Sequence, residues 1–178
     1  MKAVRFHAHG GPEVLRFEDA PDPIAGPGEA LVRVRACALN HLDLFQRRGM
    51  DRVQVPFPHI SGADVSGEVI STPNGEFAPG RRVMLQPGIS CGRCAACLDG
   101  RDNECAKYDV LGSCSDGGYG EIVKVPVQNL IAIPDAIGFV EAAAFPLTFL
   151  TAWHMLITRA KLRAGEDVLV LEIGRAHV

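Results

Sequence analysis

The chain has 178 residues, a length that holds one domain or one domain and part of a second. Its 47 % hydrophobic and 22 % charged residues exclude a disordered protein, and its net charge of −3 gives no reason to expect a nucleic-acid partner. There is no apolar run long enough for a transmembrane helix, and the first residues lack the apolar segment of a signal peptide. We therefore expect a cytoplasmic protein with no membrane partner.

Short strands separated by glycine and proline turns are predicted along the first 135 residues. Alternating apolar and polar residues, or short apolar runs, predict strands at 2–7, 14–17, 29–38, 62–70, 82–86, 122–125 and 130–134. One short helix is expected between Asn40, a good N-cap residue, and Gly49, a good C′ residue. Many short strands joined in this way imply a small antiparallel β-barrel.

The pattern changes after this point. Residues 139–161 are rich in alanine and leucine and predict helix, interrupted at Pro146. The apolar run Val168–Leu171 is typical of a strand buried on both faces of a parallel sheet. We therefore expect one domain at 1–138 and the beginning of a second at 139–171.

Four of the six cysteines lie close together between these strands, with spacing x2, x2 and x7. Short turns at this spacing bring four thiolates together around one Zn²⁺, and four thiolates leave no open position for substrate. The predicted ligands of this structural zinc are Cys91, Cys94, Cys97 and Cys105, in a lobe at 88–106. Three nearby cations are positioned by sequence to offset its negative charge: Arg93, Arg101 and Lys107.

Three other interpretations of the cysteines remain. A disulfide framework requires an oxidising compartment and usually a smaller chain. An iron–sulfur cluster also uses four cysteines, but the nearest ferredoxin spacing ends in x3 followed by proline. Unliganded core cysteines rarely gather in this way.

Several motifs together carry a resemblance that runs from Met1 to Leu171. They are Val34-Arg-Ala-Cys-Ala-Leu-Asn-His-Leu-Asp43, Gly62-Ala-Asp-Val-Ser-Gly-Glu-Val69, Gly80-Arg-Arg-Val83, the four cysteines, Asp116-Gly-Gly-Tyr119 and the segment Thr148–Trp153. The chain resembles the medium-chain dehydrogenase/reductase superfamily. The resemblance implies a GroES-like barrel with a zinc lobe, followed by a Rossmann domain that binds NAD(H) or NADP(H) and exchanges hydride with a small molecule.

The resemblance also shows a departure. Zinc-dependent members hold a second, catalytic zinc, and its three ligand positions match Asn40, Ala63 and Leu147 here. None of these side chains binds zinc well. An asparagine at the first position is similar to the quinone-reductase branch, most of which lack the structural lobe. The resemblance therefore favours a carbonyl, enone or quinone substrate over a simple alcohol. It also implies an Asn40 amide that either orients that substrate or only caps a helix.

Other residues receive roles from the resemblance alone. Asp43 is expected to be either a second group of the catalytic centre or an ordinary first-turn acid. His41 matches a position near the cofactor pyrophosphate, and Thr151 matches one that contacts the nicotinamide side. His59 lies near the former metal site, where an isolated loop histidine is usually just solvated. Cys37 reads as a strand residue, and we assign no role to Cys114.

The last seven residues are expected not to belong to the protein. A Rossmann domain needs Gly-x-Gly-x-x-Gly directly after its first strand, whereas the chain continues as Glu172-Ile-Gly-Arg-Ala-His-Val178. Those residues are what a common sequencing-adapter sequence encodes. We therefore interpret the chain as a fragment of an oxidoreductase that by itself binds no dinucleotide.

The sequence thus favours the N-terminal part of an NAD(P)-dependent oxidoreductase with one structural zinc and no catalytic zinc. The resemblance implies a homodimer or homotetramer for the intact protein. Two alternatives remain. One is a zinc-dependent alcohol dehydrogenase whose catalytic metal uses shifted ligands such as Cys37 and His59. The other is a non-enzymatic GroES-like zinc-binding module.

Overall fold

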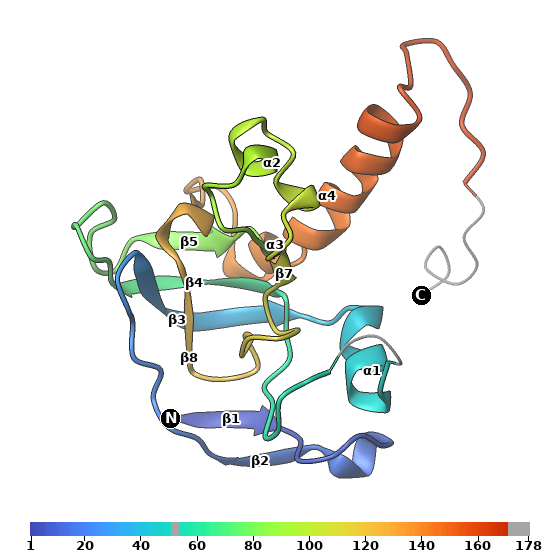
Figure 1. Cartoon of the computed structure of the whole chain (residues 1–178). Coiled ribbons are helices and arrows are strands. Elements are labelled where there is room, and N and C mark those ends of the chain that lie inside the picture. The colour runs from blue at the N-terminus through green and yellow to red at the C-terminus, as the bar shows by residue number, and fades with distance from the viewer. Residues whose placement is uncertain (51–53, 171–178) are drawn as a thin grey trace. The chain divides into compact units, whose positions relative to one another are not determined.

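A computed structural model describes residues 1–50 and 54–170 of the chain. The chain divides into two units, Met1–Thr148 and Phe149–Val178, and each is described here by itself. The first unit is built on a five-stranded antiparallel sheet of order β8-β3-β4-β5-β9, with two further two-stranded sheets, β1-β2 and β6-β7 (Figure 1).

The strands are β1 (Lys2–Arg5), β2 (Arg16–Asp19), β3 (Glu29–Ala38), β4 (Asp64–Ser71), β5 (Arg82–Leu85), β6 (Gly88–Ile89), β7 (Asp109–Val110), β8 (Ile122–Pro126) and β9 (Leu130–Ala132). The α-helices are α1 (His41–Arg48), α2 (Ala95–Leu98), α3 (Phe139–Ala143) and α4 (Pro146–Trp153). Three 3₁₀ turns, η1 (Pro12–Val14), η2 (Asp102–Glu104) and η3 (Val127–Asn129), and a π-helical segment, η4 (His154–Arg159), complete the described elements.

The centre of the first unit is the pairing of β3 with β4. A Cβ added at Gly67 would lie 2.1 Å from the carbonyl oxygen of Arg33, so only glycine allows these two strands their close approach. Register shifts near Val34 and Ala36 bend β3 across the sheet. The core beneath the sheet is aliphatic and consists of Ala30, Val32, Val65, Val69, Val83, Leu85, Leu111, Val123, Val125 and Leu130.

The β1-β2 hairpin forms a separate layer beside this sheet (Figure 1). It is tied to the rest of the unit by a backbone hydrogen bond from Val4 to Tyr119 and by a bridge between Phe6 and His59. The second strand begins later than the sequence predicted, at Arg16, because Pro12 starts a 3₁₀ turn that occupies residues 12–14.

Helix α1 confirms the predicted helix boundaries. Asn40 is the N-cap in extended conformation, and its backbone N–H donates to the Asp43 carboxylate at 2.7 Å. Gly49 ends the helix with φ of 95°, a conformation that costs glycine little. The helix turns its polar residues Asp43, Gln46 and Arg47 inward, so its buried side is unusually polar.

Two predictions about the architecture are wrong within the described residues. The strands do not close into a barrel, because β8 and β9 lie at opposite ends of the five-stranded order and do not pair. Val168–Val170 form no strand, and Leu169 is 82 % exposed. An apolar run becomes a parallel strand only when it is hydrogen-bonded to neighbouring strands, and no described strand pairs with it.

The helical interpretation of 139–161 is confirmed, with α4 beginning at Pro146 as its first residue, where a proline costs no backbone hydrogen bond. The domain boundary after residue 138 stays a prediction. The proposed non-native tail, Glu172–Val178, lies outside the described residues. No helix in the described part is both long and apolar enough to cross a bilayer.

Candidate functional site

The four predicted zinc ligands converge. The Sγ atoms of Cys91, Cys94, Cys97 and Cys105 all lie within 4.8 Å of one another. The Sγ atom of Cys97 lies 3.4 Å from that of Cys94 and 3.9 Å from that of Cys91. Sulfurs bound to one tetrahedral Zn²⁺ are roughly 3.8 Å apart, given a Zn–S bond near 2.3 Å. The donor set and its spacing therefore fit one zinc ion.

Local structure explains how the lobe presents these sulfurs. Cys94 is the N-cap residue of α2, and η2 ends at Cys105. Backbone N–H groups, first that of Arg93, lower the pKa of the Cys91 thiol to about 6. A further backbone N–H, that of Lys107, donates to Cys105 Sγ at 3.3 Å. Main-chain donors, which need no side-chain ordering, thus favour the thiolate form of Cys91.

The predicted role of Arg101 needs correction. Arg101 forms ion pairs with Asp99, at 3.1 Å, and with Glu104, so its guanidinium is committed to carboxylates rather than to thiolates. None of the six cysteines, all of them in the described residues, forms a disulfide. The short strands β6 and β7 pair at the base of the lobe and hold its two ends together, which the sequence did not predict.

A second centre lies where the catalytic-zinc positions were matched. Asn40 Nδ2 donates to Asp64 Oδ2 at 3.0 Å, and the backbone N–H of Leu147 donates to Asp64 Oδ1 at 2.8 Å. Ala63, the third matched position, is the neighbour of Asp64 and is 1 % exposed. The three positions therefore do come together, and the group that joins them is a carboxylate.

Asp43 is the hydrogen-bonding centre of the adjoining region. Its carboxylate accepts from the backbone N–H groups of Asn40 and Gly62 and from the hydroxyl of Tyr119, at 2.7, 3.1 and 2.9 Å. Burial, followed by the charge of Asp43, raises the pKa of Tyr119, which keeps this phenol a proton donor. Asp43 thus accepts hydrogen bonds from three separate segments of the chain. Its predicted role beside Asn40 in a catalytic centre stays a prediction.

Cys37 and His59, the shifted ligands of the alternative interpretation, have other contacts. Cys37 Sγ packs against the backbone of Gly62 and Gly118, where an added Cβ would come within 2.8 and 2.9 Å. His59 is fully buried, and its Nε2 lies 2.9 Å from the carbonyl oxygen of Gly112. Within the described residues, the cysteine lobe is the only place where three or more metal-ligating side chains come together. That no catalytic metal is held near Asn40 nevertheless stays a prediction.

His59 is therefore a packed residue and not a solvated one, which corrects the sequence interpretation. Its ring lies edge-on to Phe6 at 5.5 Å, and its Nδ1 is 4.0 Å from Asp116. Burial lowers its pKa below the ordinary 6.5, although Gly112 and Asp116 oppose this shift. Folding therefore favours the neutral ring.

The pH dependence of stability should reveal this buried histidine. A depressed pKa in the folded state contributes stability that is complete above pH 6.5 and is lost as the pH falls from there through the folded pKa. We expect denaturant unfolding to show this loss in the wild type and a weaker one in His59→Gln, which keeps an N–H donor for Gly112. Equal slopes between pH 7 and pH 5 in both proteins would contradict the assignment.

The two residues predicted to contact the cofactor are accessible. His41 is the exposed first residue of α1, with its ring 6.0 Å from that of Phe45. Thr151 is an exposed residue of α4 in the second unit. Their cofactor roles stay predictions. Cys114 is exposed and lies outside the zinc lobe, and its backbone N–H donates to Asp109.

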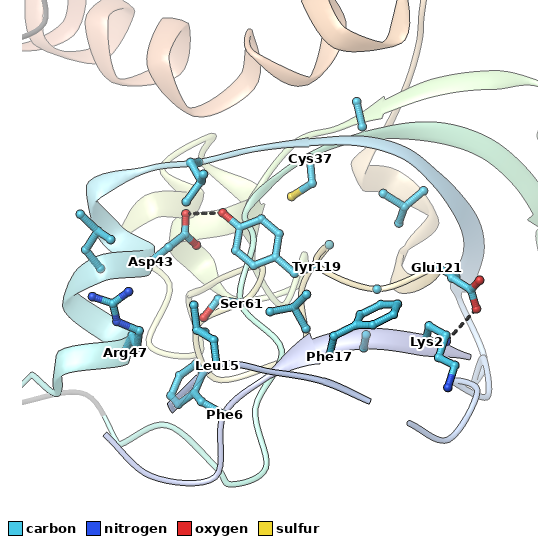
Figure 2. Close-up of a pocket in the computed structure, with 18 of the residues that line it drawn as sticks. Lys2, Phe6, Leu15, Phe17, Cys37, Asp43, Arg47, Ser61, Tyr119 and Glu121 are labelled. Atoms are coloured by element: carbon cyan, nitrogen blue, oxygen red, sulfur yellow. Dashed lines mark hydrogen bonds between the residues drawn. The ribbon is translucent and has the colours of Figure 1, made fainter. Parts of the chain in front are cut away.

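A cavity of about 560 Å³ lies between the β1-β2 hairpin, β3 and α1 (Figure 2). Its lining is mainly apolar, with Phe6, Leu15 and Phe17 facing Cys37 and the ring of Tyr119 (Figure 2). The Tyr119 hydroxyl and the Asp43 carboxylate bond to each other on its wall. Asn40, Asp64 and Leu147 do not line it. The cavity is therefore distinct from the Asn40 centre, and we place no chemistry in it.

An antiparallel sheet that carries a four-thiol lobe, with a short capped helix after its longest strand, defines a GroES-like domain of the dehydrogenase type. The chain belongs to the alcohol dehydrogenase GroES-like domain family, whose model matches residues 26–135, and hence to the medium-chain dehydrogenase/reductase superfamily.

Individual relatives are oxidoreductases. The chain is 31 % identical to L-galactonate-5-dehydrogenase of Escherichia coli and 30 % identical to quinone oxidoreductase of Pongo abelii, over 92 % and 96 % of its own length. It spans about half of these relatives, 47 % and 45 %. Among solved structures, an NAD-dependent alcohol dehydrogenase is 49 % identical with a TM-score of 0.90, over 94 % of this chain and 49 % of that one. A cobalt- and zinc-bound alcohol dehydrogenase from Pyrobaculum aerophilum is 34 % identical, with a TM-score of 0.84 over 93 % of this chain and 50 % of that one.

Proposed function

We propose that this chain is the N-terminal part of an NAD(P)-dependent oxidoreductase that exchanges hydride with a carbonyl, enone, quinone or alcohol substrate. The observation that carries the proposal is the centre at Asn40, where an amide and a carboxylate are hydrogen-bonded beside the positions matched by resemblance to the ligands of a catalytic zinc. The two relatives named first, a dehydrogenase and a quinone oxidoreductase, support both the reaction class and the substrate class.

The contacts of Asn40 and Asp43 support their proposed roles. Asn40 is half-buried, so its amide is within reach of both the protein and a ligand. It orients the substrate oxygen by donating a hydrogen bond, which is a substitute for the polarisation that a metal would supply. Asp43 holds the segment around Asn40 in place by accepting hydrogen bonds from the backbone N–H groups of Asn40 and Gly62 and from the Tyr119 hydroxyl. His41 and Thr151 contact the dinucleotide, and a bound nicotinamide supplies or accepts the hydride.

The zinc that fits the lobe has a structural role in this proposal. Cys91, Cys94, Cys97 and Cys105 would provide all four ligands, so the ion would have no open position for substrate. Four reduced thiols suit a reducing compartment, and we place the protein in the cytoplasm. By analogy with the superfamily, we propose a homodimer or homotetramer for the intact protein.

The test uses the full-length protein with NADH or NADPH and a panel of ketones, enones, quinones and alcohols. We expect cofactor oxidation or reduction that depends on the substrate, together with one zinc per chain by elemental analysis. Two zinc ions per chain would support the shifted-ligand dehydrogenase instead. Binding of zinc without turnover on any member of the panel would support a non-enzymatic zinc-binding module.

The variant Asn40→Ser separates the two roles of this residue. Serine is a good N-cap but has no amide, so the helix should keep its stability while the substrate loses its donor. We expect the melting temperature to fall by about 2–6 °C, because Asp64 loses one hydrogen-bond partner, and kcat to fall roughly 10-fold to 100-fold. An unchanged kcat would reduce Asn40 to a helix cap.

A further inference from the structure

The orientation of a side-chain amide depends on what each of its ends contacts. At Asn40 the nitrogen end is fixed, because its partner Asp64 is a carboxylate side chain that lies 3.0 Å from Nδ2. An ionised carboxylate only accepts hydrogen bonds, so it selects the N–H end of the amide and rejects the oxygen end. A primary amide has two N–H groups, and Asp64 accepts one of them. The second then points away from Asp64 in the plane of the amide.

We propose that Asp64 is the positioning residue of the Asn40 centre, fixing the amide so that its second N–H is presented to the substrate oxygen. This inference rests on the proposed function and deepens it. It assigns the site a ligand of defined chemistry: an oxygen that accepts a hydrogen bond, as in a ketone, an enone or a quinone. A chain of bonds from carboxylate to amide to carbonyl also polarises each successive donor, which strengthens the last bond.

Asp64 is well placed to hold this orientation. Asp64 is 1 % exposed. One carboxylate oxygen accepts a hydrogen bond from Asn40 Nδ2 and the other accepts one from the backbone N–H of Leu147. A carboxylate held at two points cannot rotate without breaking a bond in a buried site. Burial raises the pKa of Asp64, and the hydrogen bond from Asn40 is the first of the two contacts that oppose this rise.

The same strand provides a matched comparison. Ser66 lies two residues along β4, on the same face of the strand, and its hydroxyl donates to the carbonyl oxygen of Phe139 at 2.6 Å. Asp64 and Ser66 therefore both hold the segment that contains α3 and the start of α4, but only Asp64 also contacts Asn40. A further acid of this strand, Glu68, is half-buried and pairs with Arg35 at 2.8 Å.

The experiment compares Asp64→Asn with Ser66→Ala and Glu68→Gln in the full-length protein. In Asp64→Asn one of the two acceptor oxygens becomes an NH2 group, so in this geometry the remaining oxygen faces either the Leu147 N–H or Asn40 Nδ2. We expect kcat to fall roughly 10-fold to 100-fold, because the donor loses its fixed direction. Glu68→Gln should leave kcat within about twofold of the wild type, and Ser66→Ala should do so as well although it loosens the same helical segment.

A second readout does not depend on activity. The side-chain amide resonances of Asn40 in a ¹H–¹⁵N spectrum should shift in Asp64→Asn and stay in place in both control variants. Unshifted Asn40 resonances in Asp64→Asn would overturn the proposal, as would an equal loss of kcat in Ser66→Ala. If the wild type turns over no substrate, the proposed function fails, and the resonances still decide whether Asp64 fixes the amide.

Discussion

Replacing Cys105 by serine is expected to empty the zinc site and to unfold the lobe while leaving the five-stranded sheet folded. Cys105 is 6 % exposed and is one of four sulfurs that lie within 4.8 Å of one another. With three thiolates left, the site loses its tetrahedral donor set. Structural zinc contributes about 10–16 kcal/mol in isolated zinc-finger peptides, and a lobe anchored on a sheet should lose less, on the order of 3–5 kcal/mol.

Elemental analysis measures the loss of zinc, thermal unfolding measures the loss of stability, and amide exchange locates the segment that unfolds. Zinc should fall from one ion per chain to nearly none, and amide exchange should increase in residues 88–110 before it increases in β3 and β4. The control is Cys114→Ser, because Cys114 is exposed and has no place among the four sulfurs. A Cys105→Ser protein that keeps its zinc and its melting temperature would show that the cluster is not a metal site.

Replacing Asp43 by alanine is the second large effect that we expect. Asp43 is 6 % exposed and accepts hydrogen bonds from the backbone of Asn40 and Gly62 and from the hydroxyl of Tyr119. Its removal leaves three donors without their acceptor in a buried region. Each unsatisfied buried group costs about 1–3 kcal/mol, so the free energy of unfolding should fall by about 4 kcal/mol. Denaturant unfolding monitored by circular dichroism measures this loss.

The matched variant for Asp43 is Tyr119→Phe. It removes a single donor and keeps the aromatic ring, so it should cost about 1 kcal/mol. The double variant completes a thermodynamic cycle, and we expect a coupling energy of about 1 kcal/mol because the two groups share one bond. If Asp43→Ala costs no more than Tyr119→Phe, the two backbone contacts of Asp43 contribute little, and Asp43 is not the acceptor for three segments.

The sequence predicted the elements whose signals are local. The helix between Asn40 and Gly49 was placed correctly because N-cap and C′ residues act on backbone groups within one turn. The zinc lobe was predicted for the same reason, since all four cysteines lie within a short segment with characteristic spacing. Strand β3 matched its predicted range, because its alternation of residue types extends over ten residues.

The interactions that the sequence did not reveal are long-range. Asp64 falls within the predicted strand at 62–70, and nothing local indicates that its partner, the N–H of Leu147, lies 83 residues away. The pairing of Gly88–Ile89 with Asp109–Val110 was missed because two-residue strands are too short for an alternating pattern.

The apolar run at 168–170 was predicted to be a strand, and the structure shows no strand there. Its composition is that of a strand buried on both faces, yet Val168, Leu169 and Val170 are 46, 82 and 72 % exposed. The composition describes an environment, and the strand forms only where neighbouring strands supply that environment. A sequence pattern of this kind indicates the environment in which a segment would form a strand, and not whether the fold supplies that environment.

The base of the cysteine lobe has a consequence for protein engineering. Because β6 and β7 pair there, Gly88 and Val110 are direct neighbours in the sheet register. Because its two ends are already adjacent, the lobe can be removed or transplanted as one unit. Cut out and replaced by a tight turn, it should leave the remaining fold with little entropic penalty, since the closing loop becomes shorter. Grafted into a related domain with the same two-strand stem, it should carry its metal preference with it.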